Sequence, residues 1–144
     1  MIAVSTHLAA ILSAVEPLAA EQRPLEHARG RVLRHPVHAA VDVPGFDNSA
    51  MDGFAVRADD VAIVPVTLRV VADLPAGTSR NPALRPGEAA RIMTGAPVPT
   101  DATAVVPFED TRDGLADSLS ETTVLVAPRG RGAHIRRRGS DTPA

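Results

Sequence analysis

Five short apolar runs, each separated from the next by turn-forming residues, most constrain the fold of this chain. The runs are rich in β-branched residues, and thirteen prolines and ten glycines provide for many connections. The intervening turns contain Pro75-Ala76-Gly77, Pro86-Gly87, Pro97-Val98-Pro99 and Asp113-Gly114. We therefore predict a strand-rich domain with strands over residues 55–56, 64–71, 89–93, 104–108 and 122–126.

The N-terminal forty residues have a different, helical pattern. Ser5 or Thr6 can cap a helix that Pro17 ends, and a second short helix is expected over 24–30. The first helix carries one stripe of apolar residues at helical spacing, namely Leu8, Ile11, Leu12 and Val15. One such stripe is enough to dock a helix, but it does not keep a helix of this length folded alone.

Composition narrows the possible functions. The chain has three phenylalanines, no tyrosine or tryptophan and no cysteine, so disulfides and thiolate metal sites are excluded. Residues 1–128 hold ten arginines and sixteen acids, giving −6, whereas residues 129–144 hold five arginines and one acid, giving +4. An acidic body with few aromatics argues against nucleic-acid binding. No apolar run reaches the length of a membrane span, and a soluble cytoplasmic protein is expected.

The run Pro-Gly-Phe-Asp-Asn-Ser-Ala-Met-Asp-Gly-Phe-Ala-Val-Arg over residues 44–57 places two carboxylates, Asp47 and Asp52, among small residues. Such acids can hold a hard cation such as magnesium, and small residues allow a ligand to approach the backbone closely. The alternative is a Pro-Gly turn followed by an Asp-Gly hairpin turn. The acids Asp59 and Asp60, which come next, are expected in a solvated turn or at a helix start.

A second stretch, Arg-Ile-Met-Thr-Gly-Ala-Pro-Val-Pro over residues 91–99, leaves an apolar strand directly. We expect uncovered backbone amides at Gly95 and Ala96, and a Thr94 hydroxyl able to donate to a phosphate or an oxyanion. It is not a Walker loop, because no Gly-Lys-Ser/Thr follows. The alternative is a strand that simply stops at a proline turn.

The third stretch, His-Ile-Arg-Arg-Arg-Gly-Ser-Asp over residues 134–141, has the highest local charge density. Adjacent arginines repel each other, so a folded protein must place them against acids or use them to bind an anion. The possible partners are the acidic body, a facing subunit and an anionic substrate. The alternative is a frayed, solvated terminus. The histidines His35 and His38 lie beside a proline and off any helix, so zinc ligation there is not expected.

Together with residues 104–107, Ala-Val-Val-Pro, these three stretches resemble the molybdopterin molybdenumtransferases of the MoeA type, which are related to the gephyrin E domain. The resemblance covers essentially the whole chain but not the whole family protein, because the family's nucleotide-fold catalytic domain and C-terminal domain are absent. We therefore expect the N-terminal portion of such an enzyme, whether a natural short form or a truncated chain. The implied fold is α+β and mostly β. Residues 1–40 would form an elongated helical domain rejoined by 134–144, and residues 41–133 an inserted β-rich domain.

The resemblance also implies a function, which is insertion of molybdate into adenylylated molybdopterin with release of AMP, aided by Mg²⁺. It implies catalytic roles for Asp52, Thr94 and Asp141, with Asp52 also the metal ligand. Ser140 stands where the family more usually has an acid. The expected substrate-binding residues are Asp47, Ser49, Gly95, Arg136, Arg137 and Arg138.

Family members act as homodimers, with these residues contributed across the subunit interface. The alternative is a non-catalytic dimerisation or substrate-capping module that needs a partner chain with the catalytic domain. No nucleic-acid or membrane partner is expected.

Overall fold

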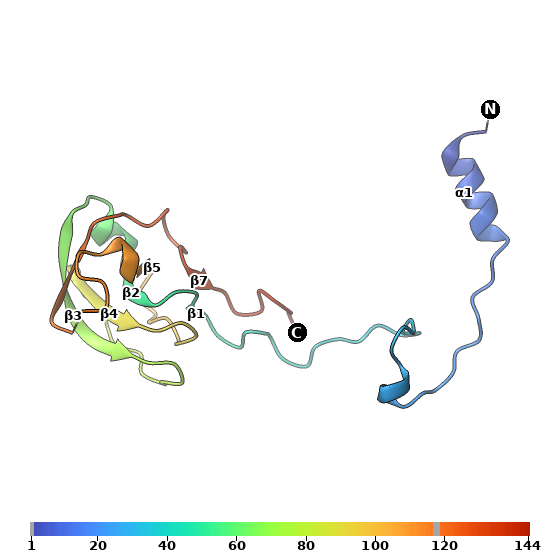
Figure 1. The fold of residues 1–144 in the computed structure, drawn as a ribbon, viewed down its shortest axis with the longest axis horizontal. Helices are drawn as coiled ribbons and strands as arrows, with labels where there is room; N and C mark the ends of the chain where they lie inside the picture. The colour runs from blue at the N-terminus through green and yellow to red at the C-terminus, as the bar shows by residue number, and fades with distance from the viewer. Residues whose placement is uncertain (1, 117–118) are drawn as a thin grey trace. The chain divides into compact units, whose positions relative to one another are not determined.

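A computed structural model describes residues 2–116 and 119–144 of the chain, which divide into two units, Met1–Val37 and His38–Ala144. The units are coloured from blue through to red along the chain in Figure 1. Nothing in the described residues is a helix long and apolar enough to cross a membrane. The prediction that residues 134–144 rejoin an N-terminal domain of residues 1–40 stays a prediction.

The N-terminal unit contains one α-helix, α1 (Val4–Ser13), and one 3-10 turn, η1 (Leu25–His27). The helix begins earlier than predicted, because Ala3 takes the N-cap position and no side chain caps the helix. The capping roles predicted for Ser5 and Thr6 are therefore wrong. The helix predicted over 24–30 is limited to the single turn of η1. None of the described residues of either helix is buried, so the apolar stripe of α1 is exposed within this unit.

The C-terminal unit is built on a five-stranded sheet with the order β5-β2-β4-β3-β6. Strands β3 and β4 run parallel and the other neighbouring pairs antiparallel. The strands are β2 (Gly53–Val56), β3 (Val66–Leu74), β4 (Glu88–Ile92), β5 (Ala104–Pro107) and β6 (Glu121–Val124). All five predicted strands are present, with ends shifted by at most three residues, and the predicted mostly-β fold is confirmed.

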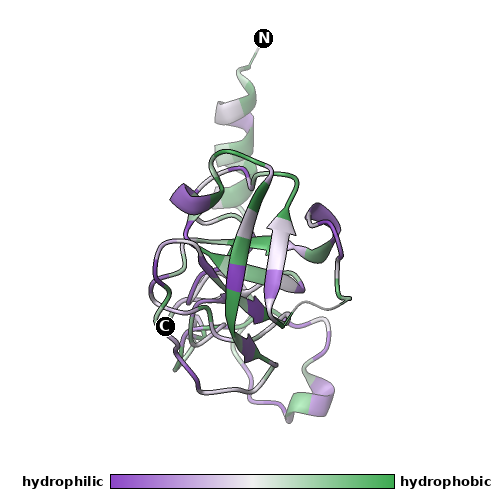
Figure 2. Ribbon diagram, turned by 90° about the vertical axis from the view of Figure 1, so that its left-hand side faces the viewer, coloured by the Kyte–Doolittle hydropathy of each residue, from purple (hydrophilic) through white to green (hydrophobic). Residues whose placement is uncertain are grey.

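The sheet curls so that its two outer strands are linked. A 3-10 turn, η3 (Phe108–Asp110), follows β5 directly, and Thr111 then forms a bridge to Val124 on β6. Phe108 packs edge-to-face on Phe54 of β2, with ring centroids 5.3 Å apart and planes at 87°. This geometry is favourable for aromatic pairs. The turn thus covers one core of the unit, and Figure 2 shows green, hydrophobic stretches interrupted by polar residues along the strands.

A bulge in β3 moves its buried side chains from one face of the sheet to the other. Val70 pairs with Ala89 of β4, but Ala72 pairs with Ala90, so the register shifts by one residue between them. One extra residue reverses which side chains point to which face. Val70 accordingly lies in one buried cluster with Phe54, whereas Ala72 lies in a second cluster with Ala55. Both faces of β2 are covered, and all four of its residues are buried.

The glycine that begins β2 is required by packing. A Cβ atom built on Gly53 would lie 2.0 Å from the carbonyl oxygen of Val106 and 2.9 Å from the Cα of Pro107, both on β5. The Asp-Gly pair is therefore not a hairpin turn, and Gly53 does not leave room for a ligand. It lets β2 approach β5 closely, and it thereby fixes the position of Asp52, the residue before it.

We predict that Gly53→Ala destabilises the protein by about 3 kcal/mol or more, because backbone atoms of β5 cannot yield to the added methyl group. Urea unfolding followed by circular dichroism measures the change. Gly45→Ala is the matched control, since the nearest atom to its Cβ is 3.9 Å away and its φ is ordinary. The control should change stability by less than about 0.5 kcal/mol. Equal stability of the two variants would contradict this role for Gly53.

Candidate functional site

Backbone hydrogen bonds bring the first two motifs of the sequence together at one end of β2. The amide of Ser49 donates to the carbonyl of Ala96 (3.0 Å), and the amide of Gly95 donates to the carbonyl of Ser49 (2.9 Å). The amide of Val98 donates to the carbonyl of Asp47 (3.1 Å). Residues 47–49 and 95–98 therefore lie side by side, although the sequence separates them by nearly fifty positions.

The third motif joins the same place through a two-stranded ribbon. Strand β1 (Asn48–Ser49) pairs antiparallel with β7 (Ile135–Arg136), and the amide of Ala50 donates to the carbonyl of His134 (2.9 Å). His134 has a φ of 56°, in the left-handed region that non-glycine residues seldom adopt. All three predicted motifs thus meet in the part of the C-terminal unit that contains β1 and β7, which are labelled in Figure 1.

Asp52 holds the second motif through one carboxylate oxygen. Its Oδ1 accepts a hydrogen bond from the Thr94 amide (2.6 Å) and another from the Thr94 hydroxyl (2.8 Å). These two donors, the amide first, keep the pKa of Asp52 below its ordinary value. Within residues 2–116 and 119–144 no donor lies within hydrogen-bond distance of Oδ2, and the side chain is exposed. One oxygen of Asp52 is therefore engaged and the other faces solvent.

The turn at Thr94 does not offer the open amides that the sequence predicted. The Gly95 amide is bonded to Ser49, the Ala96 amide donates to the carbonyl of Met93 (3.0 Å), and the Thr94 amide is bonded to Asp52. The Thr94 hydroxyl hydrogen is also used by Asp52. The expectation of free amides at Gly95 and Ala96 is wrong, because the turn satisfies its own donors.

Gly95 has a conformational role in this turn. Its φ of +82° matches the third residue of a type II turn that begins at Met93, a position that favours glycine. A Cβ built on Gly95 would meet nothing within 4 Å, so backbone strain rather than crowding selects the residue.

Ser49 supports the loop that leads to Asp52. Its side chain is fully buried, and its hydroxyl donates to the carbonyl of Met51 (2.5 Å) while accepting from the Met51 amide (3.3 Å). The neighbouring Asn48 is also buried and donates through Nδ2 to the carbonyl of Phe46 (3.2 Å). Because the Ser49 side chain is fully buried, it has no exposed atom with which to bind substrate as predicted.

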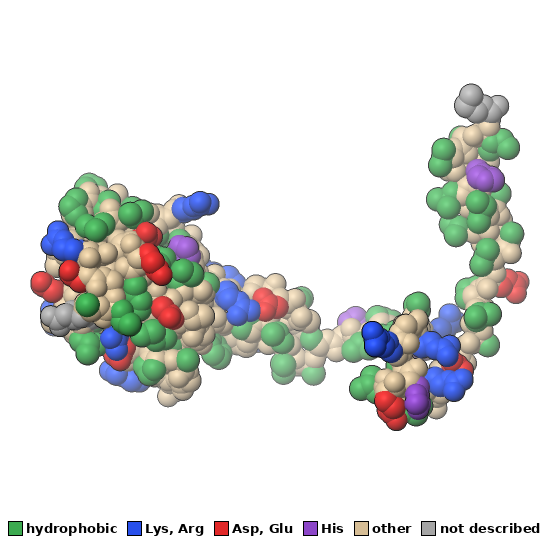
Figure 3. Space-filling view, viewed as in Figure 1, with side chains coloured by type: hydrophobic (Ala, Val, Ile, Leu, Met, Phe, Trp, Pro, Cys, Tyr) green, Lys and Arg blue, Asp and Glu red, His purple; other side chains and the backbone are tan. Residues whose placement is uncertain are grey.

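Each arginine of the third motif is paired with an aspartate of this unit. The ion pairs are Arg136 with Asp141, Arg137 with Asp47, and Arg138 with Asp42. The Arg138 amide also donates to Asp47 Oδ1 (2.8 Å), and this amide, followed by Arg137, lowers the pKa of Asp47. Of the three partners considered for the arginines, the structure shows the first, which is the acidic side chains of the chain itself. The six charged groups sum to zero, and acidic and basic side chains also intermingle on the face drawn in Figure 3.

Asp42 is a member of this cluster that the motifs did not identify. Its carboxylate binds Arg138 and accepts from the Ala144 amide (2.9 Å), and that amide, with Arg138 second, lowers its pKa. Gly139 has a φ of +69°, and a Cβ atom at this position would lie 3.1 Å from Oδ1 of Asp42. No signal in the sequence singled out Asp42, since the motifs already contain three acids for the three consecutive arginines.

Other predicted groups lie away from this cluster. Asp59 and Asp60 lie in the 3-10 helix η2 (Ala58–Val61), as expected of a helix start, and Asp59 forms an ion pair with Arg131 (2.6 Å). No group of three or more histidine, cysteine or acidic side chains suited to a metal occurs among the described residues. At the motif cluster, Asp52 is the acid whose partners are uncharged.

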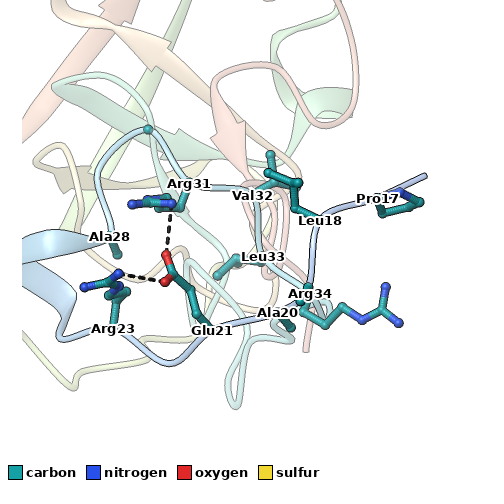
Figure 4. Close-up of a pocket in the computed structure, with 12 residues that line it drawn as sticks. Pro17, Leu18, Ala20, Glu21, Arg23, Ala28, Arg31, Val32, Leu33 and Arg34 are labelled. Atoms are coloured by element: carbon teal, nitrogen blue, oxygen red, sulfur yellow. Dashed lines mark hydrogen bonds and ion pairs between the residues drawn. The ribbon is translucent and has the colours of Figure 1, made fainter. Parts of the chain in front are cut away.

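The N-terminal unit contains a separate hollow of about 740 Å³, shown in Figure 4. Apolar and arginine side chains line it, and Glu21 binds Arg23 (2.7 Å) and Arg31 (2.9 Å) along it. None of the predicted site residues contributes to this hollow.

Comparison with known proteins assigns nearly the whole chain to one family. The family described as the MoeA N-terminal region (domain I and II) matches residues 2–144. Molybdopterin molybdenumtransferase 2 of Mycobacterium tuberculosis is 50% identical over 125 residues, which are 84% of this chain and 30% of that protein. The molybdopterin molybdenumtransferase of Synechococcus elongatus is 40% identical over 131 residues, 87% of this chain and 31% of that protein.

Solved structures show the same fold. A crystal structure of the molybdopterin biosynthesis MoeA protein from Pyrococcus horikoshii superposes with a TM-score of 0.71 at 32% identity, covering 85% of this chain and 32% of that one. The fold and the motif cluster define an N-terminal region of the MoeA class. The chain belongs to the MoeA N-terminal region family. It spans about a third of the length of the curated relatives it matches.

We predict that Thr94→Val raises the pKa of Asp52 without restoring it to the ordinary value, because the amide, which is the larger cause, remains. Carbon-detected NMR of the Asp52 carboxyl group across pH measures this. A lowered carboxyl pKa stabilises the folded state above the ordinary pKa, and this stabilisation disappears as pH falls through the lowered pKa. Thr94→Val should therefore be less stable than the natural chain at pH 7, by up to about 1 kcal/mol, and converge with it in acid.

Thr94→Ser is the control, since it keeps both donors and should leave the pKa of Asp52 unchanged. A valine variant with the same Asp52 pKa as the serine variant would show that the hydroxyl does not hold the carboxylate.

Proposed function

We propose that this chain acts in molybdenum cofactor biosynthesis as the N-terminal part of a molybdopterin molybdenumtransferase. The reaction would be insertion of molybdate into adenylylated molybdopterin with release of AMP. One observation carries the proposal. A chain of this family sets Asp52 at the end of a buried strand with one oxygen fixed by Thr94 and the other exposed to solvent.

The exposed oxygen of Asp52 fits a divalent cation of the magnesium type. Magnesium usually keeps several waters and is held by one or two carboxylates together with substrate phosphates, so a complete protein cage is unnecessary. Asp52 meets this requirement, because its charge is not neutralised by an arginine and its lowered pKa keeps it ionised near neutral pH. When bound there, the cation would neutralise negative charge on the phosphates of the substrate.

Thr94 and Gly95 would then act by positioning Asp52. The turn presents the Thr94 amide and hydroxyl to one oxygen of Asp52, and this contact fixes the direction of the other oxygen. Gly95 allows the turn to form at low cost. Rigid support of this kind matters, because small displacements of a charged group weaken its effect on a reaction.

The arginines would bind anionic groups of the substrate in addition to their aspartates. A guanidinium has five N–H donors, and one aspartate uses only part of them. The side chains of Arg136, Arg137 and Arg138 are 49–68% exposed, so further donors are accessible. Asp47 and Asp141 would hold the arginines in place, and this differs from the direct contact with substrate that the resemblance implies for both acids.

The catalytic unit would include more than this chain. The relatives named above are about three times as long, so the remaining parts of the site would come from a nucleotide-fold domain, with a second copy of the chain completing a homodimer. A second candidate function follows from the same observation. The chain would be a non-catalytic dimerisation or substrate-capping module that works with a separate chain bearing the catalytic domain.

A chimera tests the proposal. The 144 residues replace the matched segment of molybdopterin molybdenumtransferase 2 of Mycobacterium tuberculosis, which is 50% identical over 125 residues. We expect the chimera to release AMP in a molybdate-dependent reaction. Asp52→Asn in the chimera should lower the rate by about 10²-fold or more with no loss of folding, because one charged group at the reacting phosphates is removed.

Asp59→Asn is the matched control, since it likewise removes the charge of one exposed aspartate of the same unit, in this case one paired with Arg131, and the rate should stay within about twofold. Equal rates for the two variants would contradict the role of Asp52. Mixing the 144-residue chain with the separate remainder of the relative distinguishes the two candidate functions. Activity restored by the mixture supports the module, whereas activity of the fused chimera alone supports a single continuous enzyme.

A further inference from the structure

One aromatic side chain of the C-terminal unit is not used by its core. The chain contains three phenylalanines and no tyrosine or tryptophan. Phe54 and Phe108 form the edge-to-face pair inside the sheet, whereas Phe46 is 51% exposed. Phe46 lies in the first motif, directly before Asp47. An exposed aromatic ring beside a cluster of charged groups is a common element of binding surfaces.

The backbone that carries Phe46 is held from both sides. The buried Asn48 donates to the carbonyl of Phe46 (3.2 Å). The Gly139 amide donates to the carbonyl of Pro44 (2.9 Å), and the Val98 amide to the carbonyl of Asp47 (3.1 Å). Little ordering of the chain is therefore needed when a ligand contacts the ring, and the entropic cost of binding is correspondingly small.

The residue next to Phe46 is tied to two cationic residues. Asp47 binds the guanidinium of Arg137 and the amide of Arg138. The ring of Phe46 thus directly precedes, in the chain, an aspartate that binds two arginine residues of the segment after β7. A ligand that matches this pattern has a planar ring at one end and an anionic group at the other. By contrast, Ile63 is 85% exposed in the same unit and lies in no such cluster.

We infer that Phe46 stacks on the planar, nitrogen-containing ring system of the substrate while its anionic group lies toward Arg137 and Arg138. This inference rests on the proposed function, in which the substrate carries both a pterin and an adenine ring. Stacking on an aromatic side chain tolerates different rings, because every such ring has a π-face. The pterin ring and the adenine ring are therefore tested separately.

The absence of tryptophan from the sequence makes a direct test possible. Phe46→Trp in the 144-residue chain introduces a single fluorophore at the proposed stacking position. Pterin and AMP are titrated separately, with correction for their absorbance. We expect saturable quenching by at least one of them. Ile63→Trp is the matched control, and it should show only linear, collisional quenching.

Saturation by pterin assigns the pterin end of the substrate to Phe46, and saturation by AMP assigns the adenine end. Linear quenching at position 46 by both compounds, or the same curve at positions 46 and 63, overturns the inference. This readout does not depend on catalysis. An inactive chimera together with saturable quenching at position 46 would contradict the proposed function but still support ring binding at Phe46.

Kinetics of the chimera give a second test. Phe46→Leu keeps an apolar side chain but loses the ring, and we expect KM for adenylylated molybdopterin to rise about tenfold with kcat nearly unchanged. Phe46→Tyr keeps the ring and should stay within about twofold of the parent KM. An active chimera in which the leucine and tyrosine variants have equal KM values overturns the inference and leaves the proposed function standing.

Discussion

The contact between the Asp52 carboxylate and Thr94 is the interaction on which the rest of the site depends. Asp52 comes directly before a strand whose first residue is held against β5, and Thr94 is the second residue of the turn that follows β4. One oxygen of Asp52 accepts both hydrogens that Thr94 can donate. The carboxylate is thereby kept ionised and oriented, and its second oxygen stays exposed.

Ion pairs and backbone hydrogen bonds together hold the neighbouring cluster of charged residues. Three arginines and three aspartates pair one to one, and backbone bonds join the same segments, such as the Asp141 amide to the Val43 carbonyl (2.9 Å). Exposed ion pairs contribute little individually, but a network on a fixed backbone places each guanidinium in a defined position. Asp52 differs from these acids, because its hydrogen-bond donors are uncharged.

The sequence predicts the strands well, because β-branched runs and turn residues are local signals. It also identifies the three motifs that meet, through their resemblance to a family. It does not show that Gly95 and Ala96 use their amides within the protein, since that depends on contacts with Ser49 and Met93 that only the fold creates. The sequence does not identify Asp42 as a member of the cluster either, because its partners Arg138 and Ala144 lie about a hundred positions further along the chain.

The role of Gly53 illustrates how one residue type serves different purposes. An Asp-Gly pair in a sequence favours a hairpin turn, yet here the glycine begins a buried strand because β5 lies too close for a side chain. The bulge in β3 is likewise not visible in the spacing of its apolar residues. It becomes evident only when the register with β4 is known.

The most direct test of the account is NMR of the chain titrated with Mn²⁺ as a paramagnetic substitute for Mg²⁺. The account predicts that signals of residues around Asp52 and Thr94 broaden first, and that Asp52→Asn abolishes this broadening. Signals near Asp42, Asp47 and Asp141 should be less affected, because arginines neutralise those acids. Broadening that is spread evenly over all exposed acids, or that survives in the Asp52→Asn variant, would contradict the account.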